Sequence, residues 1–123
     1  EYLRTTCRQV RRLFVLGTLS LKEELQAAGF ETTGLDAEDE PDAVVVGFDT
    51  ALVYEQLCRA AWWIAQGKPF LATHPDRVCP TDAPTVLPDC GAICACLEQA
   101  TGRPPDAVLD SIADLPDWLG VRG

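Results

Sequence analysis

The stretch Ala43-Val44-Val45-Val46-Gly47-Phe48-Asp49 decides the fold of this chain. Three consecutive valines have stiff, β-branched side chains, which disfavour a helix and favour an extended strand. Because the run is apolar on both of its alternating faces, it is typical of a strand covered from both sides, as in a parallel sheet. We therefore predict a central parallel strand here, which delivers the chain into a polar loop, Phe48-Asp49-Thr50.

The segment before this strand predicts a second strand followed by a helix. Leu13–Leu16 is another apolar run, and Gly17 ends it. Ser20 is the expected N-cap of the helix, with Glu23 as its capping-box partner, and Gly29 ends the helix. The acidic segment that follows is expected to form a solvated loop with a short edge strand over Phe30–Thr33.

The segment after the central strand predicts a helix and then another strand. Apolar residues recur at helical spacing over Tyr54–Gln66, and Lys68–Thr73 is the next expected strand, leading into a loop over His74–Asp82. Trp62 and Trp63 lie about 100° apart on this helix, so we expect one in the core and the other at an edge or interface.

The last part of the chain continues the alternation of strands and helices. We expect an extended segment at Thr85–Leu87, a helix over Gly91–Thr101, a strand at Asp106–Leu109 and a terminal helix at Ser111–Leu119. Strands that alternate with helices imply crossover connections, so the predicted fold class is α/β, a mostly parallel sheet with helices packed on it.

Length and charge narrow the classes of function. The 123 residues suit a single domain, and a net charge of −9 repels phosphate backbones and anionic lipids, so neither nucleic acid nor a membrane is an expected partner. The first residues do not resemble an export signal, which predicts a cytoplasmic location. The chain contains no methionine, even at position 1, from which we expect either a processed chain or a segment of a longer protein.

Six cysteines are expected to be reduced thiols in a cytoplasmic protein. On a helix, Cys90 and Cys94 share a face and Cys96 points elsewhere. The spacing does not match the paired knuckles of a structural zinc site, and Asp36–Asp42 lacks the ligand pattern of a calcium loop, so we expect no metal site.

The candidate site lies where the predicted strands end, because ligands of open α/β sheets bind beyond the carboxyl ends of the strands. The loops to consider begin at Gly17-Thr18, at Phe48-Asp49-Thr50 and at Thr73-His74-Pro75-Asp76. His74, the single histidine, could act as an acid, a base or a hydrogen-bonding selector of substrate, or simply as a solvated turn residue. With one histidine and no nucleophile elbow, the chain offers no catalytic triad.

Three stretches resemble the subfamily IIA phosphatases of the haloacid dehalogenase superfamily. They are VRRLFVLGTLSLKEELQAAGFE, VVVGFDTALVYEQLCRAAWWIAQGKPFLATHPDRVCPT and DCGAICACLEQATGRPPDAVL. The resemblance implies that residues 1–109 form the α/β cap that such enzymes insert into their catalytic core, and that residues 110–123 correspond to the C-terminal helix of the parent. The core's Asp-x-Asp nucleophile, its lysine and its Mg²⁺-binding aspartates are not recognisable, so we expect no catalytic residues and no cofactor here, although the parent family uses Mg²⁺.

The resemblance also implies a set of substrate-binding residues. They are, in two loops, Phe48, Asp49, Thr50, His74, Asp76, Arg77 and Cys79. Family members often have Asn or Asp where this chain has His74. Asp76 could instead cap the amides of its own loop, and Arg77 could pair with nearby acids. The implied partner is a phosphorylated small molecule, bound together with the missing core.

The sequence therefore leaves three hypotheses about the function of this chain. The main one is an inactive, isolated specificity cap. A second is a small-metabolite binding or dimerisation module, with Trp62 or Trp63 anchoring a homodimer. The third is an active phosphatase that uses Asp49, although the second aspartate of the family motif is replaced by Ala51.

Overall fold

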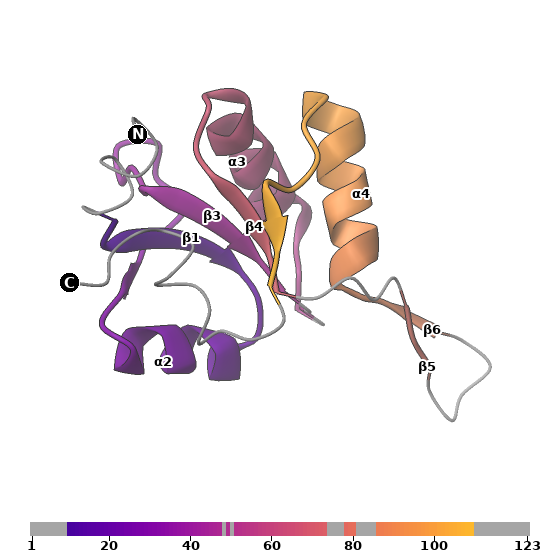
Figure 1. Ribbon diagram of the computed structural model, residues 1–123, viewed down its shortest axis with the longest axis horizontal. Coiled ribbons are helices and arrows are strands. Elements are labelled where there is room, and N and C mark those ends of the chain that lie inside the picture. The colour runs from indigo at the N-terminus through magenta and orange to yellow at the C-terminus, as the bar shows by residue number, and fades with distance from the viewer. Residues whose placement is uncertain (1–9, 48, 50, 74–77, 81–85, 110–123) are drawn as a thin grey trace.

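A computed structural model describes residues 10–47, 49, 51–73, 78–80 and 86–109. The described part contains a five-stranded parallel sheet in the order β2-β1-β3-β4-β7 and a separate two-stranded antiparallel ribbon, β5-β6 (Figure 1). The sheet strands are β1 (Arg12–Leu16), β2 (Glu31–Thr32), β3 (Ala43–Val46), β4 (Phe70–Ala72) and β7 (Ala107–Val108). The ribbon consists of β5 (Val78–Pro80) and β6 (Val86–Pro88), and the helices are α2 (Leu19–Ala27), α3 (Tyr54–Ala65) and α4 (Cys90–Thr101).

The central position of β3 confirms the prediction made from its valines. It pairs with β1 on one side and β4 on the other, so that Val45 lies opposite Val15 and Leu71. All four of its residues are buried. The fold class is α/β with a parallel sheet, as the alternation of strands and helices predicts.

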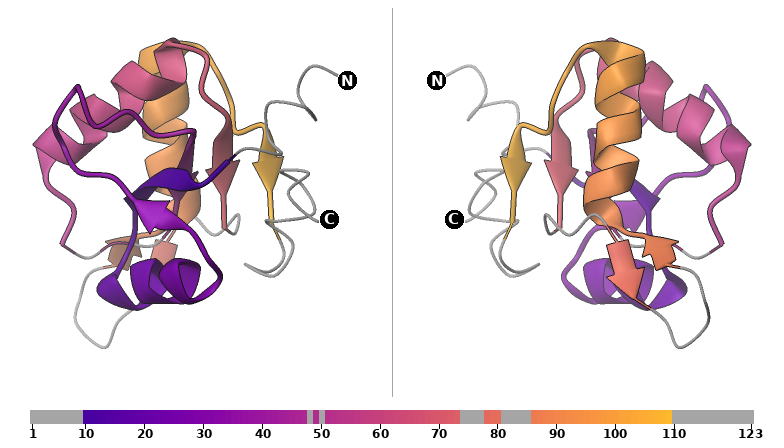
Figure 2. Two further views of the ribbon diagram at one scale, coloured as in Figure 1. Left: turned by 90° about the vertical axis from the view of Figure 1, so that its left-hand side faces the viewer. Right: turned by 90° about the vertical axis from the view of Figure 1, so that its right-hand side faces the viewer.

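The two faces of the sheet carry separate halves of the core. Val44 and Val46 pack with Trp63 and Leu97 beneath α3 and α4, whereas Val45 packs with Leu25 of α2. Figure 2 shows α3 and α4 on one face of the sheet and α2 on the other. This three-layer arrangement explains why β3 is apolar at every position.

The helix α3 separates its two tryptophans as expected. Trp63 is 5% exposed and joins the core, whereas Trp62 is 50% exposed. The helix spans Tyr54–Ala65, which confirms the predicted Tyr54–Gln66 to within one residue at its C-terminal end.

The predicted N-cap of the first helix is wrong. Thr18, not Ser20, is the N-cap of α2, and its hydroxyl oxygen accepts a hydrogen bond from the Leu21 N–H at 3.2 Å. The helix starts earlier because it packs directly against the strand ends: a Cβ at Gly47 would lie 2.7 Å from Leu21 Cδ2. With so little room, the single residue after Gly17 must cap the helix.

The predicted loop at His74–Asp82 is also wrong in part. Val78–Pro80 forms β5, which pairs antiparallel with β6 so that Cys79 lies opposite Leu87. Each of these strands is three residues long and ends in proline, so neither shows the alternation that predicts a strand. The predicted terminal helix, Ser111–Leu119, lies outside the described residues.

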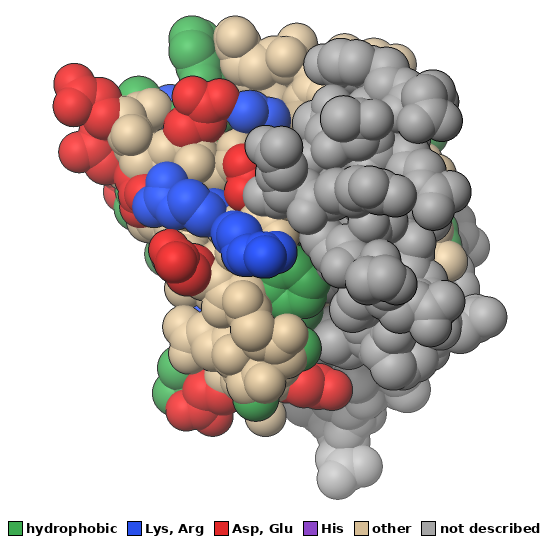
Figure 3. Space-filling model, turned by 60° about the vertical axis from the view of Figure 1, so that its left-hand side comes forward, with side chains coloured by type: hydrophobic (Ala, Val, Ile, Leu, Met, Phe, Trp, Pro, Cys, Tyr) green, Lys and Arg blue, Asp and Glu red, His purple; other side chains and the backbone are tan. Residues whose placement is uncertain are grey.

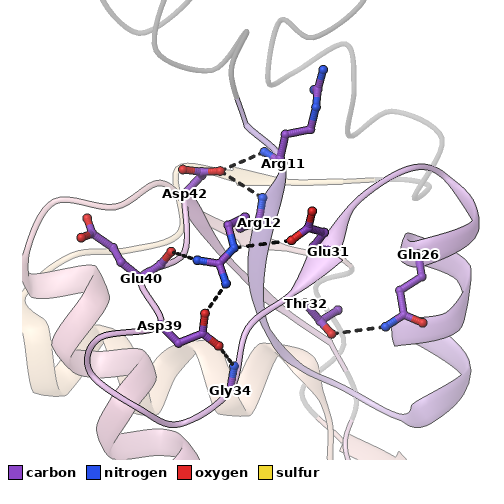
Figure 4. A network of polar contacts seen from close by, with 9 residues as sticks. All are labelled: Arg11, Arg12, Gln26, Glu31, Thr32, Gly34, Asp39, Glu40 and Asp42. Carbon is purple, nitrogen blue, oxygen red and sulfur yellow. Dashed lines mark hydrogen bonds and ion pairs between the residues drawn. The ribbon is translucent and has the colours of Figure 1, made fainter.

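Acidic residues of the β2–β3 connection are held at the amino ends of the strands (Figure 4). Asp42 accepts hydrogen bonds from the backbone N–H groups of Arg11 and Arg12 at 2.9 and 3.0 Å. Asp39 accepts one from the Gly34 N–H at 2.8 Å and also pairs with the Arg12 guanidinium. These two interactions lower the pKa of Asp39, the Gly34 hydrogen bond having the larger effect.

The connection is therefore anchored as well as solvated. Glu40 pairs with Lys68 at 2.5 Å, and its carbonyl accepts a hydrogen bond from Arg12. Figure 3 shows a face of the molecule on which basic side chains lie next to acidic ones. None of the described helices is long and apolar enough to cross a membrane.

Candidate functional site

An open cavity of about 250 Å³ lies beyond the carboxyl ends of β1 and β3. Its lining comes from the residue pair after β1, the first turn of α2, the loop after β3 and the start of α3. The lining residues are Gly17, Thr18, Leu19, Lys22, Asp49, Ala51 and Gln56. Two of the three loops expected from the sequence thus border one cavity.

Asp49 is the predicted site residue whose surroundings the structure describes. It is partly buried, and its Oδ1 accepts a hydrogen bond from the Ala51 N–H at 2.9 Å. This contact stabilises a turn at the end of β3. The other carboxylate oxygen makes no hydrogen bond with the described residues, so it can accept one from a ligand.

Sequence reasoning missed the polar side chains that line the cavity together with Asp49. Lys22 is partly buried and forms no ion pair within the described part of the chain. The Gln56 Oε1 accepts a hydrogen bond from the Val53 N–H at 3.0 Å, which leaves the amide NH₂ as a donor. The Thr18 hydroxyl, which caps α2 as an acceptor, can still donate its own proton.

The position of Lys22 relative to the N-cap could have predicted that it lines the cavity. Side chains on a helix lean toward its N-terminus, so a residue one turn after the N-cap reaches back over the strand end. If Ser20 were the N-cap, Lys22 would be only two residues after it and would not be expected to reach back over the strand end. Correct identification of Thr18 would have placed Lys22 at the mouth of the cavity.

The lining can bind a small polar molecule but holds little catalytic machinery. It offers one cation, one carboxylate, one amide and one hydroxyl group, so it can both donate and accept hydrogen bonds. Ala51, two residues after Asp49, has no acid or base to contribute. Among the residues that the structure describes, no group of three or more His, Cys, Asp or Glu could hold a metal ion.

Most of the other predicted site residues lie outside the described part of the chain. These are Phe48, Thr50, His74, Asp76 and Arg77. Cys79 lies on β5, in the ribbon that extends away from the carboxyl end of the sheet in Figure 1. Their proposed contacts with substrate therefore remain predictions.

The cysteines of α4 divide between core and surface as their spacing predicts. Cys90 and Cys94 are buried and Cys96 is exposed. The Cys90 thiol donates a hydrogen bond to the Val46 carbonyl at 3.0 Å. A hydrogen bond with Cys90, together with burial, raises the pKa of Cys94, which keeps that thiol neutral.

Comparison with known proteins gives a consistent set of relatives, although no protein-family model matches the chain. The ribonucleotide monophosphatase NagD of Escherichia coli K12 is 36% identical over 95 residues, which are 77% of this chain and 35% of that protein. The chain thus spans about a third of the length of this curated relative.

Solved structures give the same result. The 4-nitrophenylphosphatase from Thermotoga maritima aligns with a TM-score of 0.73 and 34% identity over 98% of this chain and 47% of its own. A glycerol phosphate phosphatase from Mycobacterium tuberculosis, in complex with magnesium, aligns with a TM-score of 0.73 and 30% identity over 86% of this chain and 34% of its own.

Proposed function

Since this chain is a homologue of the subfamily IIA phosphatases of the haloacid dehalogenase superfamily, we propose that it acts as the substrate-specificity cap of a Mg²⁺-dependent phosphate monoester hydrolase. The observation that carries the proposal is the extent of the match. Nearly all of this chain aligns with less than half of the 4-nitrophenylphosphatase, 98% against 47%. That share suits one domain of a two-domain enzyme.

The cavity at the strand ends suits the task of a cap. A cap covers a reacting centre, excludes water and contacts the part of the substrate that does not react. Lys22, Asp49 and Gln56 can together hold the polar leaving group of a phosphate ester. The expected loop residues His74, Asp76, Arg77 and Cys79 would extend this contact, with the phosphate itself held by a core domain.

We further propose that the 123-residue chain alone does not hydrolyse phosphate esters. The superfamily mechanism that the resemblance implies needs an aspartate nucleophile and a second aspartate two residues later, and Asp49 is followed there by Ala51. The described residues also provide no carboxylate cluster for Mg²⁺, so the ion does not fit this part of the protein. A cytoplasmic location and a homodimer remain predictions.

The test is an assay of the purified chain with 4-nitrophenyl phosphate and Mg²⁺. We expect no release of 4-nitrophenol above the buffer rate, for either the wild type or Asp49→Asn. Turnover that disappeared in Asp49→Asn would overturn the proposal and establish the active phosphatase.

The mixed charge of the cavity also supports a second candidate function, a small-metabolite binding module. Lys22 and Asp49 are complementary to a ligand that carries both donors and acceptors. Titration of phosphate esters and of their dephosphorylated alcohols, followed by the amide resonances of Lys22 and Ala51, separates the two functions. A cap without its core should bind no more tightly than about 1 mM, whereas a metabolite-binding module should reach about 1 μM.

A further inference from the structure

A second hollow lies on the outer side of the molecule, between α3 and α4. These helices pack side by side on one face of the sheet (Figure 1). The groove between them has a volume of about 120 Å³. Its lining comes from both helices and consists of Tyr54, Leu57, Cys58, Ala61, Cys96, Leu97 and Ala100. None of these residues lines the cavity at the strand ends.

Two exposed thiols border this groove from opposite helices. Cys58 belongs to α3 and Cys96 to α4, and both are free and exposed, in contrast to the buried thiols of Cys90 and Cys94. No hydrogen bond joins Cys58 to Cys96 within the described structure. The two side chains thus line the same solvent-accessible space.

We propose that Cys58 and Cys96 form a two-thiolate binding site for a soft monovalent metal ion of the Cu(I) type. Thiolate sulfur selects soft ions over hard ones. Apart from the phenol of Tyr54, the remaining side chains of the lining are hydrocarbon, so the groove lacks the oxygen ligands that Ca²⁺ or Mg²⁺ requires. Zn²⁺ prefers four ligands, and no group of three or more suitable residues exists in the described part of the chain.

The surrounding structure fixes the two helices that carry these thiols. Leu57 and Ala61 pack against the core from α3, and Leu97, which is 1% exposed, does so from α4. Both helices are 12 residues long, and their facing sides are in contact along this seam. A site carried by two packed helices needs little reorganisation when it binds an ion.

The binding reaction has a defined charge balance. The two thiols each lose a proton, and both sulfur atoms bond to the ion, so a neutral site plus a monovalent cation gives a site with one negative charge and two released protons. Neither the ion nor sulfur changes oxidation state. Binding of one ion therefore displaces two protons from the protein. The net charge of −9 favours approach of a cation.

The test uses Cu(I) under anaerobic, reducing conditions in competition with a chromophoric Cu(I) chelator. The background is Cys7→Ser/Cys79→Ser, which leaves Cys58 and Cys96 with the buried Cys90 and Cys94 as the remaining cysteines and serves as the matched control. We expect one Cu(I) per chain and an ultraviolet thiolate-to-copper absorption band in this background. Either Cys58→Ser or Cys96→Ser should weaken binding by at least about 100-fold, because loss of even an outer partner of a metal ligand costs about 10- to 100-fold.

Circular dichroism checks that the variants fold. We expect them to fold, because Cys58 and Cys96 are exposed. The proposal is overturned if the Cys58→Ser/Cys96→Ser double variant retains Cu(I), or if one of the single variants binds as tightly as the background.

Discussion

Replacing Leu25 with alanine tests how α2 is held on the sheet. Leu25 is the buried residue of this helix, with 0% exposure, and packs with Val15, Phe30 and Val45. The substitution removes three carbon atoms from the core, which costs about 2.4 kcal/mol at roughly 0.8 kcal/mol per buried methylene. The cavity left behind raises the total toward 5 kcal/mol when the surroundings cannot close, with a range of about 2–5 kcal/mol.

The structure places this site near the middle of that range. The strand residues around Leu25 are fixed by hydrogen bonds in the sheet, but α2 is a nine-residue helix that can move inward. We expect a loss of about 3 kcal/mol in the free energy of unfolding, which lowers Tm by about 12 °C for a domain of this size. The fold survives this loss if its stability lies within the usual range of about 5–15 kcal/mol.

Urea denaturation followed by circular dichroism measures this loss. The matched control is Leu19→Ala in the same helix, because Leu19 is 71% exposed and its loss should change stability by no more than about 0.5 kcal/mol. A loss below about 1 kcal/mol for Leu25→Ala, or an equal loss for Leu19→Ala, would refute the packing of α2 described above. Hydrogen exchange should also show faster opening around Lys22, because α2 carries that side of the cavity.

Two further predictions concern the N-cap residue of α2 and the carboxylate of Asp39. Thr18→Ala should lower the free energy of unfolding by about 1 kcal/mol in urea denaturation, whereas Ser20→Ala should have almost no effect. A larger loss for Ser20→Ala than for Thr18→Ala would show that Ser20 is the N-cap. Because the folded-state pKa of Asp39 is lowered, its contribution to stability is present above the unfolded-state pKa and is lost as the pH falls through the folded-state value. The urea midpoint of Asp39→Asn should thus lie below that of the wild type at pH 7 and converge with it in acid, and a constant difference would contradict this.

The sequence predicted the layers of the fold because burial leaves a strong pattern in the central elements. The valines of Val44–Val46 favour a strand covered on both sides, and the apolar spacing of Tyr54–Gln66 favours a packed helix. The separation of Trp62 from Trp63 follows from the same helical geometry. These features depend on residues close together in the chain.

The features that were missed depend on contacts between distant residues. Thr18 caps α2 because Leu21 packs against Gly47, and this approach cannot be seen in the helix sequence. The pairing of β5 with β6 joins two segments that are each too short to show a pattern. Lys22 and Gln56 come to line the same cavity as Asp49 only after the crossover helices are placed.

The division of the sheet into two edges has a consequence for how this protein can diverge. Asp39, Glu40 and Asp42 secure the amino ends of the strands, whereas the cavity lies at the carboxyl ends. Insertions and substitutions in the loops that follow β3 and β4 therefore leave the anchoring contacts intact. Selection for a new ligand can therefore change the carboxyl ends of the strands without a loss of stability at their amino ends. Ligand specificity can then diverge among related proteins while the fold stays the same.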